Sequence, residues 1–426
     1  MMIRKISAAA GVTLAAALVL TACAPSSGLS GGGEATDGPA DTGQTFKIGV
    51  LAPMTSWAGA IGVDMQQGWD MFLADQGQEI GSFKIETVWE DTASDPDTAL
   101  TKARKLVQED HVDLVIGPVL ASEGLVVGDY LTQAGVVNLA MTAADDLTQR
   151  LASPMVIRTG SFTASQMSFP VGDWASKQGY KTAATICVDY AFGWESCGGF
   201  VSAFTAAGGT VTNQLWYPGD ASDLSSYVSQ LGSLDVDVIF VGSAGGTDSS
   251  NFFRTASDFG LLTKTPIVSN CCTTDQAILE DVGDIALGQI SGSFYAEGND
   301  DPVVAGFVEQ YESKFGVLPS LYSFAVYSTG QMVYDVLGKA SGKPTGQALA
   351  DAIRGVDLGS TIIGSGSLDE YGNPVGPVFI RQVVKRADGK LVNAVIETYD
   401  DVSQFWTFDP KAYLANPPFS QEFQQQ

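Results

Sequence analysis

The sequence of 426 residues contains a single histidine, and this scarcity limits the chemistry that the chain can perform. Histidine is the most common general base and metal ligand among side chains. The one histidine, His111, follows a predicted helix and precedes a predicted strand, so we expect it in a solvated loop. The composition therefore excludes histidine-rich metal sites and argues against a Ser-His-Asp triad.

Two other signatures of enzymes are missing from the sequence. GSAGG at 242–246 lacks the Gly-x-Ser-x-Gly spacing of a nucleophile elbow. SGKPTG at 341–346 places Pro344 where a phosphate-binding loop requires a hydroxyl. We find no catalytic constellation, and we predict a protein that is not an enzyme and that holds no metal and no cofactor.

Positive charge is also scarce, with 22 lysines and arginines against 48 aspartates and glutamates and a net charge of −26. Such a surface repels phosphate backbones and anionic lipid, so we expect no nucleic-acid partner. Beyond the N-terminus, the sequence has no apolar run near the about 20 residues that a membrane-spanning helix needs.

The N-terminus has the pattern of a secretory signal. Arg4 and Lys5 precede a short apolar stretch that ends in Leu-Thr-Ala-Cys23. These four residues resemble the bacterial lipobox, whose cysteine becomes the lipidated first residue of the mature protein. We predict a signal peptide at 1–22 and lipidation at Cys23, with a secreted protein that carries an incidental cysteine as the alternative.

A flexible linker is predicted at 23–45, because this segment is mainly Gly, Ser, Pro and Asp with almost nothing to bury. The expected product is a globular body on the outer face of a membrane, held there through its lipid alone.

Strand and helix patterns alternate along the rest of the chain. Apolar strand patterns occur at 46–54, 83–91, 112–119, 136–141, 183–189, 210–217, 236–243, 265–270 and 288–295. Helical patterns lie between them and at 302–315 and 321–340. Continuous apolar strands between amphipathic helices predict parallel sheets covered on both faces. Because the pattern restarts after residue 165, we predict an α/β protein with two lobes. A C-terminal hairpin is expected around Asp388-Gly389.

The predicted carboxyl ends of the strands carry small, hydroxyl-bearing or aromatic residues and no lysine or arginine. Ligands of such sheets gather beyond these ends. The segments are APMTSWAGAIG, GPVLASEG, AMTAADD, DYAFGWE, GSAGGTD and SNCCTTD.

Four of these segments, with the strands before them, carry a family resemblance. They are IGVLAPMTSWAGAIG, LVIGPVLASEG, VVNLAMTAADDLT and VDYAFGWE. Through them, residues 46 to 400 resemble the type I bacterial solute-binding proteins of the leucine/isoleucine/valine-binding family. The resemblance implies two Rossmann-like lobes around a ligand crevice, with three hinge crossovers. Lobe 1 would comprise 46–162 and 293–363, and lobe 2 would comprise 163–292 and 366–400.

The resemblance also implies a function. The protein would be an extracytoplasmic receptor of an ABC importer that captures a small solute by lobe closure and delivers it to permease and ATPase subunits. We expect a monomer. A ligand sensor that uses the same fold is the competing interpretation.

Candidate ligand-binding residues follow from positions in the family. The solute carboxylate would be held by backbone N–H groups and hydroxyls of Leu120, Ala121, Ser122, Ala140 and Thr142. Ala121 stands where the family usually has serine, and the adjacent Ser122 could replace it or could cap a helix. The Thr142 hydroxyl is expected to face the crevice.

Aromatic and small residues would complete the predicted site. Phe192 aligns with an aromatic residue that covers the ligand from lobe 2, or else it packs against Trp194. Trp57 is a candidate stacking wall or a lobe-surface anchor, and Ser243 and Cys271 complete the predicted lining.

One departure from the family concerns the ligand's ammonium. Relatives that bind amino acids have an acidic side chain after the strand that reads PIVSN here, and this chain has Cys271 and Cys272. Burying an ammonium without a carboxylate costs several kcal/mol. We therefore expect a partly apolar carboxylate or amide as solute. An amino acid is the alternative, with Asp248 or Asp189 supplying the charge.

Four cysteines remain after Cys23, an even number in an oxidising compartment. We predict a Cys187–Cys197 disulfide that closes the loop presenting Phe192, and a vicinal Cys271–Cys272 disulfide. The vicinal bond would be strained, because adjacent Cα atoms lie about 3.8 Å apart and unstrained bridges prefer at least about 4.4 Å. Two free, partly buried thiols are the alternative.

The C-terminal segment at 402–419 is too rich in aromatic residues for a free tail. We predict that residues 401–426 form an extension packed on the body, with a segment exposed for the permease as the alternative.

Overall fold

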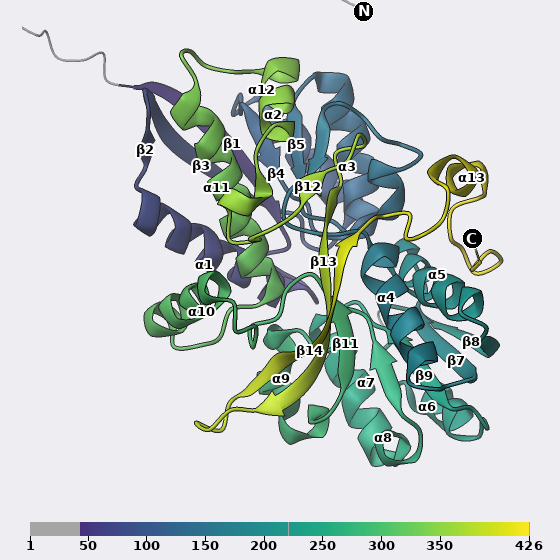
Figure 1. The fold of residues 1–426 in the computed structure, drawn as a ribbon. Coiled ribbons are helices and arrows are strands. Elements are labelled where there is room, and N and C mark those ends of the chain that lie inside the picture. The colour runs from purple at the N-terminus through teal and green to yellow at the C-terminus, as the bar shows by residue number, and fades with distance from the viewer. Residues whose placement is uncertain (1–42, 220, 426) are drawn as a thin grey trace, which may run out of the picture. The chain divides into compact units, whose positions relative to one another are not determined.

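Two mixed sheets, each covered by helices, make up the part of the chain that the computed structural model describes, residues 43–219 and 221–425 (Figure 1). The predicted signal peptide, Cys23 and nearly all of the predicted linker lie outside the described residues. Within the described residues, no helix has the length and hydropathy to cross a membrane.

The first sheet has the strand order β2-β3-β1-β4-β5-β6. Its strands are parallel except for the short edge strand β2, which runs antiparallel to β3. The bounds are β1 Gln44–Ala52, β2 Glu79–Ile80, β3 Phe83–Asp91, β4 Leu114–Ile116, β5 Val137–Ala140 and β6 Val156–Arg158.

Helices cover both faces of this sheet. They are α1 Gly59–Gln76, α2 Pro96–Gln108, α3 Ala121–Ala134, α10 Pro302–Phe315, α11 Leu321–Lys339 and α12 Gly346–Arg354. Helix α2 begins after a capping residue, since the Asp95 side chain accepts the Thr98 N–H at 2.8 Å and Pro96 is the first helical residue. Alternate residues of β1 pack against α1 on one face, whereas Leu51 packs against Leu106 of α2 on the other.

The second sheet has the strand order β12-β13-β11-β10-β9-β7-β8, and β14 pairs with β13. Strands β7 to β11 are parallel, and the C-terminal hairpin β13–β14 adds antiparallel pairing. The bounds are β7 Thr182–Val188, β8 Thr210–Tyr217, β9 Val238–Gly242, β10 Ile267–Ser269, β11 Ile290–Ser293, β12 Ser367–Leu368, β13 Pro374–Lys385 and β14 Leu391–Val402.

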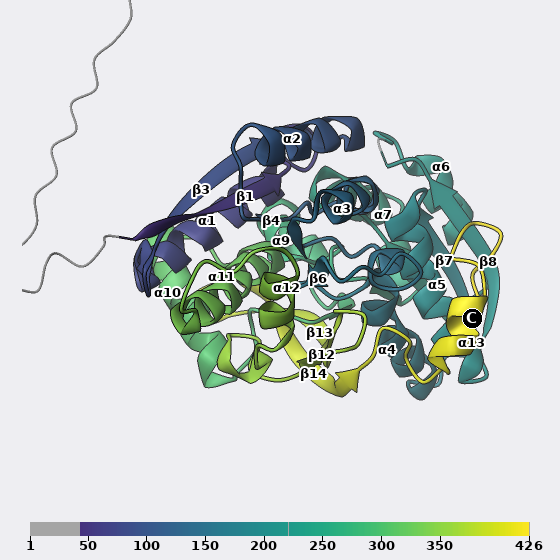
Figure 2. The same ribbon diagram turned by 90° about the horizontal axis from the view of Figure 1, so that it is seen from above.

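The helices of the second sheet complete the alternation of strands and helices. They are α4 Ala164–Lys177, α5 Ala191–Ala206, α6 Ser225–Gly232, α7 Gly246–Asp258, α8 Leu261–Lys264 and α9 Gln276–Val282. Short 3-10 turns lie at Asp145–Thr148, Gly283–Ala286 and Leu358–Ser360. Viewed from above, α4 and α5 lie beside each other at one side of the second sheet (Figure 2).

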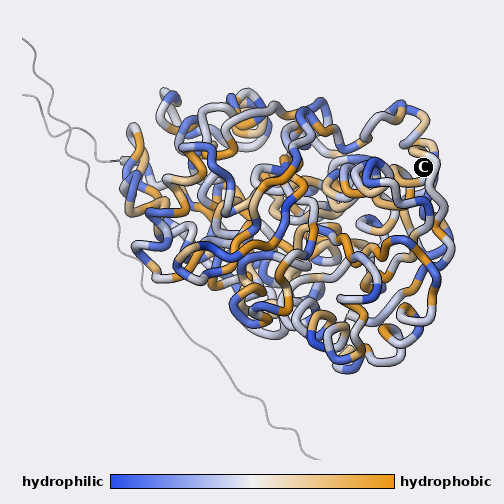
Figure 3. The backbone as a smooth tube through the Cα atoms, turned by 60° about the horizontal axis from the view of Figure 1, so that its bottom comes forward, coloured by the Kyte–Doolittle hydropathy of each residue, from blue (hydrophilic) through white to orange (hydrophobic). Residues whose placement is uncertain are grey.

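The chain passes between the two sheets at 159–163, 294–301 and 355–366, where β6 leads to α4, β11 leads to α10, and α12 leads to β12. Hydrophobic stretches run through the interior, and hydrophobic and hydrophilic residues alternate along the outer coils (Figure 3). The predicted α/β fold with two Rossmann-like lobes is confirmed.

The C-terminal residues 403–425, here called the strap, lie against both lobes. On the second lobe, Phe405, Tyr413 and Phe419 of the strap form a buried cluster with Phe169 of α4 and Ala203 of α5. The strap also contains the helix α13 Pro410–Ala415, which Figures 1 and 2 both show near α5.

The strap is held to the first lobe by Thr148 and Gln149, which donate to Gln404 at 3.2 and 3.5 Å, and above all by Arg150. The Arg150 guanidinium donates to the backbone oxygens of Tyr413 at 3.1 Å, of Asn416 at 2.8 Å and of Pro417 at 3.2 Å. Arg150 precedes β6 of the first sheet, so the strap connects the lobes independently of the three crossover segments.

Candidate functional site

A cavity lies between the two lobes, where the carboxyl ends of the parallel strands meet. The space between its side chains is about 420 Å³, including the part open to solvent. The lining residues are Val119, Leu120, Ala121, Met141, Ala143, Ser161, Met167, Tyr190, Phe192, Ala244, Cys271, Cys272, Phe294, Leu321 and Tyr322. Apart from Leu321 and Tyr322, which begin α11, they follow β4, β5 and β6 of the first sheet and β7, β9, β10 and β11 of the second, which is where ligands of such sheets bind.

The first turns of α3, α5 and α7 meet at this cavity. Leu120, Tyr190 and Gly245 are the N-cap residues of these helices, and none of the three provides a side-chain cap. The first N–H groups of a helix have no intrahelical acceptor, and the helix dipole adds positive potential there. The arrangement therefore favours an anion in the cavity.

Helix α11 also begins at the cavity, but its first N–H groups are already satisfied. The Ser320 hydroxyl accepts from the backbone of Tyr322 and Ser323, and the Asp275 carboxylate accepts from Leu321 N–H at 3.1 Å. This helix therefore contributes its side chains to the wall and does not offer free donors.

Hydroxyl groups supply the remaining polarity of the wall. They belong to Ser161, Tyr190 and Tyr322. The Ser161 hydroxyl already donates to the Phe162 carbonyl oxygen at 3.0 Å, and the Tyr322 hydroxyl donates to the Cys272 sulfur at 3.5 Å. Burial raises the pKa of Tyr190 well above its ordinary value, so its hydroxyl keeps its proton and can donate to an anion. Among the described residues that line the cavity there is no Lys, Arg, Asp or Glu. The wall can thus bind a carboxylate through neutral donors, but it offers no partner for an ammonium.

The two aspartates considered as ammonium partners lie elsewhere. Asp248 is buried behind the wall, where it accepts from Ala244 N–H at 2.7 Å and from the Tyr217 hydroxyl at 2.9 Å, and burial raises its pKa to about 6. Asp189 is exposed and accepts from the Trp194 indole at 2.9 Å. Neither carboxylate lines the cavity.

Comparison with known proteins identifies the family. A family described as "Periplasmic binding protein" matches residues 45–390. The chain belongs to this family. It is a type I periplasmic binding protein of the branched-chain amino acid group, so its family is non-enzymatic and acts outside the cytoplasm.

Individual relatives cover nearly the whole described chain. A Leu/Ile/Val-binding protein homolog 6 from Brucella abortus is 27% identical over 83% of this chain and 91% of the relative. An ABC-transporter solute-binding protein from Rhodopseudomonas palustris BisB5, solved with 3,4-dihydroxybenzoic acid, is 29% identical with a TM-score of 0.80, over 84% of this chain and 98% of that one. A second protein from R. palustris, solved with 4-hydroxybenzoate, is 25% identical with a TM-score of 0.78, over 85% and 99%.

Several predicted residues lie at the cavity of this periplasmic binding protein. Leu120, Ala121, Phe192 and Cys271 line it. Trp57 and Ser122 lie outside it, in an adjoining hollow that shares Leu120 and Tyr190 with the cavity.

Three residues that were predicted to line the site lie behind the cavity wall. Ala140, Thr142 and Ser243 are each fully buried and do not line the cavity. The expected orientation of Thr142 is wrong, because its hydroxyl accepts from Ala144 N–H at 3.2 Å and its methyl group packs against α3 at Gly124. The Ser243 hydroxyl is hydrogen-bonded to Ser249 and Thr273 at 2.6 and 2.8 Å.

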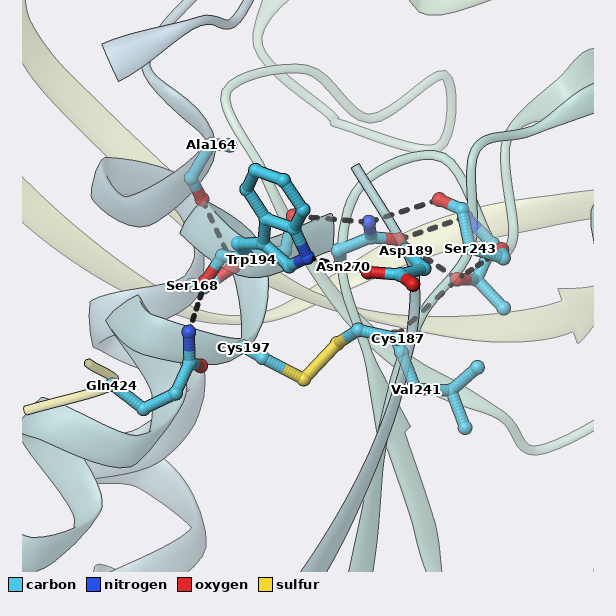
Figure 4. The surroundings of a disulfide bond; sticks show 12 residues. Ala164, Ser168, Cys187, Asp189, Trp194, Cys197, Val241, Ser243, Asn270 and Gln424 are labelled. Atoms are coloured by element: carbon cyan, nitrogen blue, oxygen red, sulfur yellow. Dashed lines mark hydrogen bonds between the residues drawn. A yellow bond between two sulfur atoms is a disulfide. The ribbon is translucent and has the colours of Figure 1, made fainter. Parts of the chain in front are cut away.

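The predicted disulfide between Cys187 and Cys197 is present, and it joins the end of β7 to α5 (Figure 4). Figure 4 also shows Asp189 and Trp194 beside it, and both lie between the two cysteines in the sequence. Since Tyr190 and Phe192 lie between the two cysteines, the bond fixes the segment that brings both rings to the cavity.

The predicted vicinal disulfide is not formed. Cys271 and Cys272 are free thiols whose sulfurs lie 3.0 Å apart, compared with about 2.05 Å in a disulfide. The short spacing of adjacent Cα atoms opposes the bond, and the Tyr322 hydroxyl donates to the Cys272 sulfur at 3.5 Å instead. This corrects the expectation of a rigid cystine on the cavity wall.

Sequence reasoning missed Ser161, Phe294, Tyr190 and Tyr322. Ser161 and Phe294 lie in segments that cross between the lobes, and Tyr322 begins a helix of the first lobe, so a rule based on strand ends does not single them out. Tyr190 could have been found, because it belongs to the DYAFGWE segment that provides Phe192.

A substitution at Gly193 tests how the start of α5 is held at the site. A Cβ atom there would lie 1.8 Å from the Val188 carbonyl oxygen, so Gly193→Ala must displace the turn that carries Tyr190 and Phe192. We expect a loss of about 1–3 kcal/mol in the free energy of unfolding, measured by urea denaturation. Gly306→Ala in α10 is the control. Its Cβ would meet no atom within 4 Å, so a gain of about 0.5–1 kcal/mol is expected. Equal stabilities of the two variants would contradict this account of the turn.

Proposed function

We propose that this protein is the solute receptor of an ABC importer and that it binds a small, partly apolar carboxylate between two closing lobes. The observation that carries this proposal is the cavity itself, where the uncapped first turns of α3, α5 and α7 meet and no charged side chain lines the wall. The family and the fold support the role in transport.

The chemistry of the wall favours an aromatic or aliphatic acid. Helix N-termini and the Tyr190 hydroxyl can hold the carboxylate, while Phe192, Phe294 and the methionines can contact an apolar body. The related proteins solved with hydroxybenzoates support this class of ligand.

An amino acid is the second candidate solute, because curated relatives are named Leu/Ile/Val-binding protein homologues. Its ammonium would lie in a cavity without a lining carboxylate, at a cost of several kcal/mol. We therefore place it second.

A thermal-shift and calorimetric comparison of matched solutes tests the proposal. Benzoate, 4-hydroxybenzoate and 3,4-dihydroxybenzoate are compared with benzyl alcohol, which lacks the carboxylate, and with leucine. At a concentration of 100 times the dissociation constant, a bound solute should stabilise the protein by about 2.7 kcal/mol. We expect stabilisation by at least one benzoate and none by benzyl alcohol or leucine. Binding of leucine without binding of any acid would overturn the assignment.

The cellular setting is part of the proposal. Residues 1–22 would be removed as a signal peptide, and Cys23 would be lipidated, with 23–45 as the tether. The mature protein would act as a monomer with permease and ATPase subunits. Within it, 46–162 with 293–363 and 163–292 with 366–400 would move as the two lobes, and 401–426 would remain packed on the body.

A further inference from the structure

The free thiols of Cys271 and Cys272 form a pair with no assigned role. Their sulfurs lie 3.0 Å apart on the cavity wall. In the described part of the chain the other cysteines, Cys187 and Cys197, are bonded to each other. The cavity therefore contains a vicinal dithiol that can act as one bidentate group.

The pair is held in place on both sides. The Arg381 guanidinium donates to the Cys271 carbonyl oxygen at 2.8 Å and to the Tyr295 carbonyl oxygen at 2.7 Å. On the other side, the Tyr322 hydroxyl donates to the Cys272 sulfur. Such prior fixation lowers the entropy cost of binding a ligand to both sulfurs.

The cavity is also the route to the thiols. Cys271 and Cys272 are 2% and 5% exposed, and both belong to the cavity lining. A reagent that reaches them must enter the space that we assign to the solute.

We propose that Cys271 and Cys272 form a binding site for trivalent arsenic compounds within the solute cavity. With arsenous acid, two As–O bonds break and two As–S bonds form, and each thiol proton leaves with a hydroxyl group as water. Neither arsenic nor sulfur changes oxidation state, and the remaining As–OH group is uncharged. One atom can bridge the two sulfurs, since bonds of about 2.3 Å, as in Zn–S, span a separation of 3.0 Å.

A divalent metal ion fits the pair poorly. Structural zinc takes four ligands, and the described residues contain no group of three or more His, Cys, Asp or Glu placed to hold a metal. A metal also requires thiolates, whereas the neighbouring Cys272 and burial raise the pKa of Cys271 well above its ordinary value. Trivalent arsenic avoids the cost of burying a charge, because its adduct with the two thiols has no net charge in the apolar cavity.

Occupancy of the pair would change the cavity. The arsenic and its remaining substituent would occupy part of the space that Cys271 and Cys272 line together with Tyr322 and Leu321. Solute and arsenical would therefore compete. This consequence depends on the proposed solute site, whereas formation of the adduct does not.

The test uses the full chain, with its thiols reduced and the Cys187–Cys197 bond verified by peptide mapping. Phenylarsine oxide is added, and intact mass is measured. We expect one phenylarsenic group per chain, with loss of one water, and reversal by 2,3-dimercaptopropanol. Cys271→Ser and Cys272→Ser should each weaken binding about a hundredfold, because linked contacts gain about 10²–10⁴ in affinity. Cys23→Ser is the matched control and should keep the adduct.

Absence of the adduct from the reduced wild type would overturn the proposal, as would binding of wild-type affinity by both single variants in a titration with phenylarsine oxide. If the serine variants do not fold, alkylation of the wild-type pair with iodoacetamide provides the same comparison, and an adduct that survives alkylation contradicts the site. A further arm measures protection by benzoate. If the solute site is elsewhere, benzoate will not slow the reaction of the two thiols with phenylarsine oxide. Formation of the adduct without benzoate tests the thiol site alone.

Discussion

Replacing Phe419 with alanine is expected to lower the free energy of unfolding by about 3–5 kcal/mol. The Phe419 side chain is 5% exposed and lies directly over α5 at Gly198, where a Cβ atom would come within 2.1 Å of its ring. Its ring centroid is 6.3 Å from that of Tyr413, which belongs to the same buried cluster. The substitution would leave a cavity between the strap and the second lobe, measurable by urea denaturation.

Phe259→Ala is the matched control for this substitution. Phe259 is 53% exposed, and replacing an exposed side chain should change stability by no more than about 0.5 kcal/mol. Truncation after Val402 should destabilise at least as much as Phe419→Ala, because it removes the whole strap. Rapid proteolytic loss of the strap with an unchanged melting temperature would instead favour a segment exposed for the permease.

Lowering the pH from 8 to 5 is expected to raise the free energy of unfolding, with about 3 kcal/mol of the change due to Glu123. Its side chain is fully buried in the first turn of α3, and burial raises its pKa from 4.5 to about 7. Between these values the native state holds a proton that the unfolded chain has released. Stability therefore falls as the pH rises through this window, by about 1.36 kcal/mol per unit of pKa difference. Burial raises the pKa of Glu297 to about 7 as well, which acts in the same direction.

Glu123→Gln isolates this contribution. The variant should be about 3 kcal/mol more stable than the wild type at pH 8 and similar to it at pH 4, by urea denaturation at each pH. Glu86→Gln, which changes an exposed carboxylate on β3, should leave the pH dependence as it is. A wild-type difference between pH 8 and pH 5 that persists fully in Glu123→Gln would assign the effect to other groups.

Much of the fold follows from local patterns in the sequence. β3 and β8 occupy the residues predicted from their apolar runs, and α10 begins and ends where its pattern does. β4 is shorter than its apolar run, because Gly117 turns with a φ of 89° and approaches the Leu51 carbonyl too closely for any larger residue. That contact joins distant parts of the chain, so periodicity could not predict it.

The site is predicted less completely than the fold. The family resemblance pointed to Ala121 and Phe192, and both line the cavity. It failed for Thr142, since the direction of that side chain depends on how closely α3 approaches at Gly124. Ser161 and Phe294 belong to connections between lobes, and their place in the cavity results from how the two halves meet.

The strap has a consequence for the timing of release. Arg150 holds the strap on the first lobe, and Phe419 holds it on the second. Hinge opening moves these two residues apart. The lobes can therefore open fully only after the guanidinium has broken its hydrogen bonds to the strap's carbonyl oxygens. Residence time would then depend on this remote anchor as well as on the fit of the solute. Two proteins with identical cavity walls could therefore differ in how long they retain their cargo if one of them lacks the arginine at position 150.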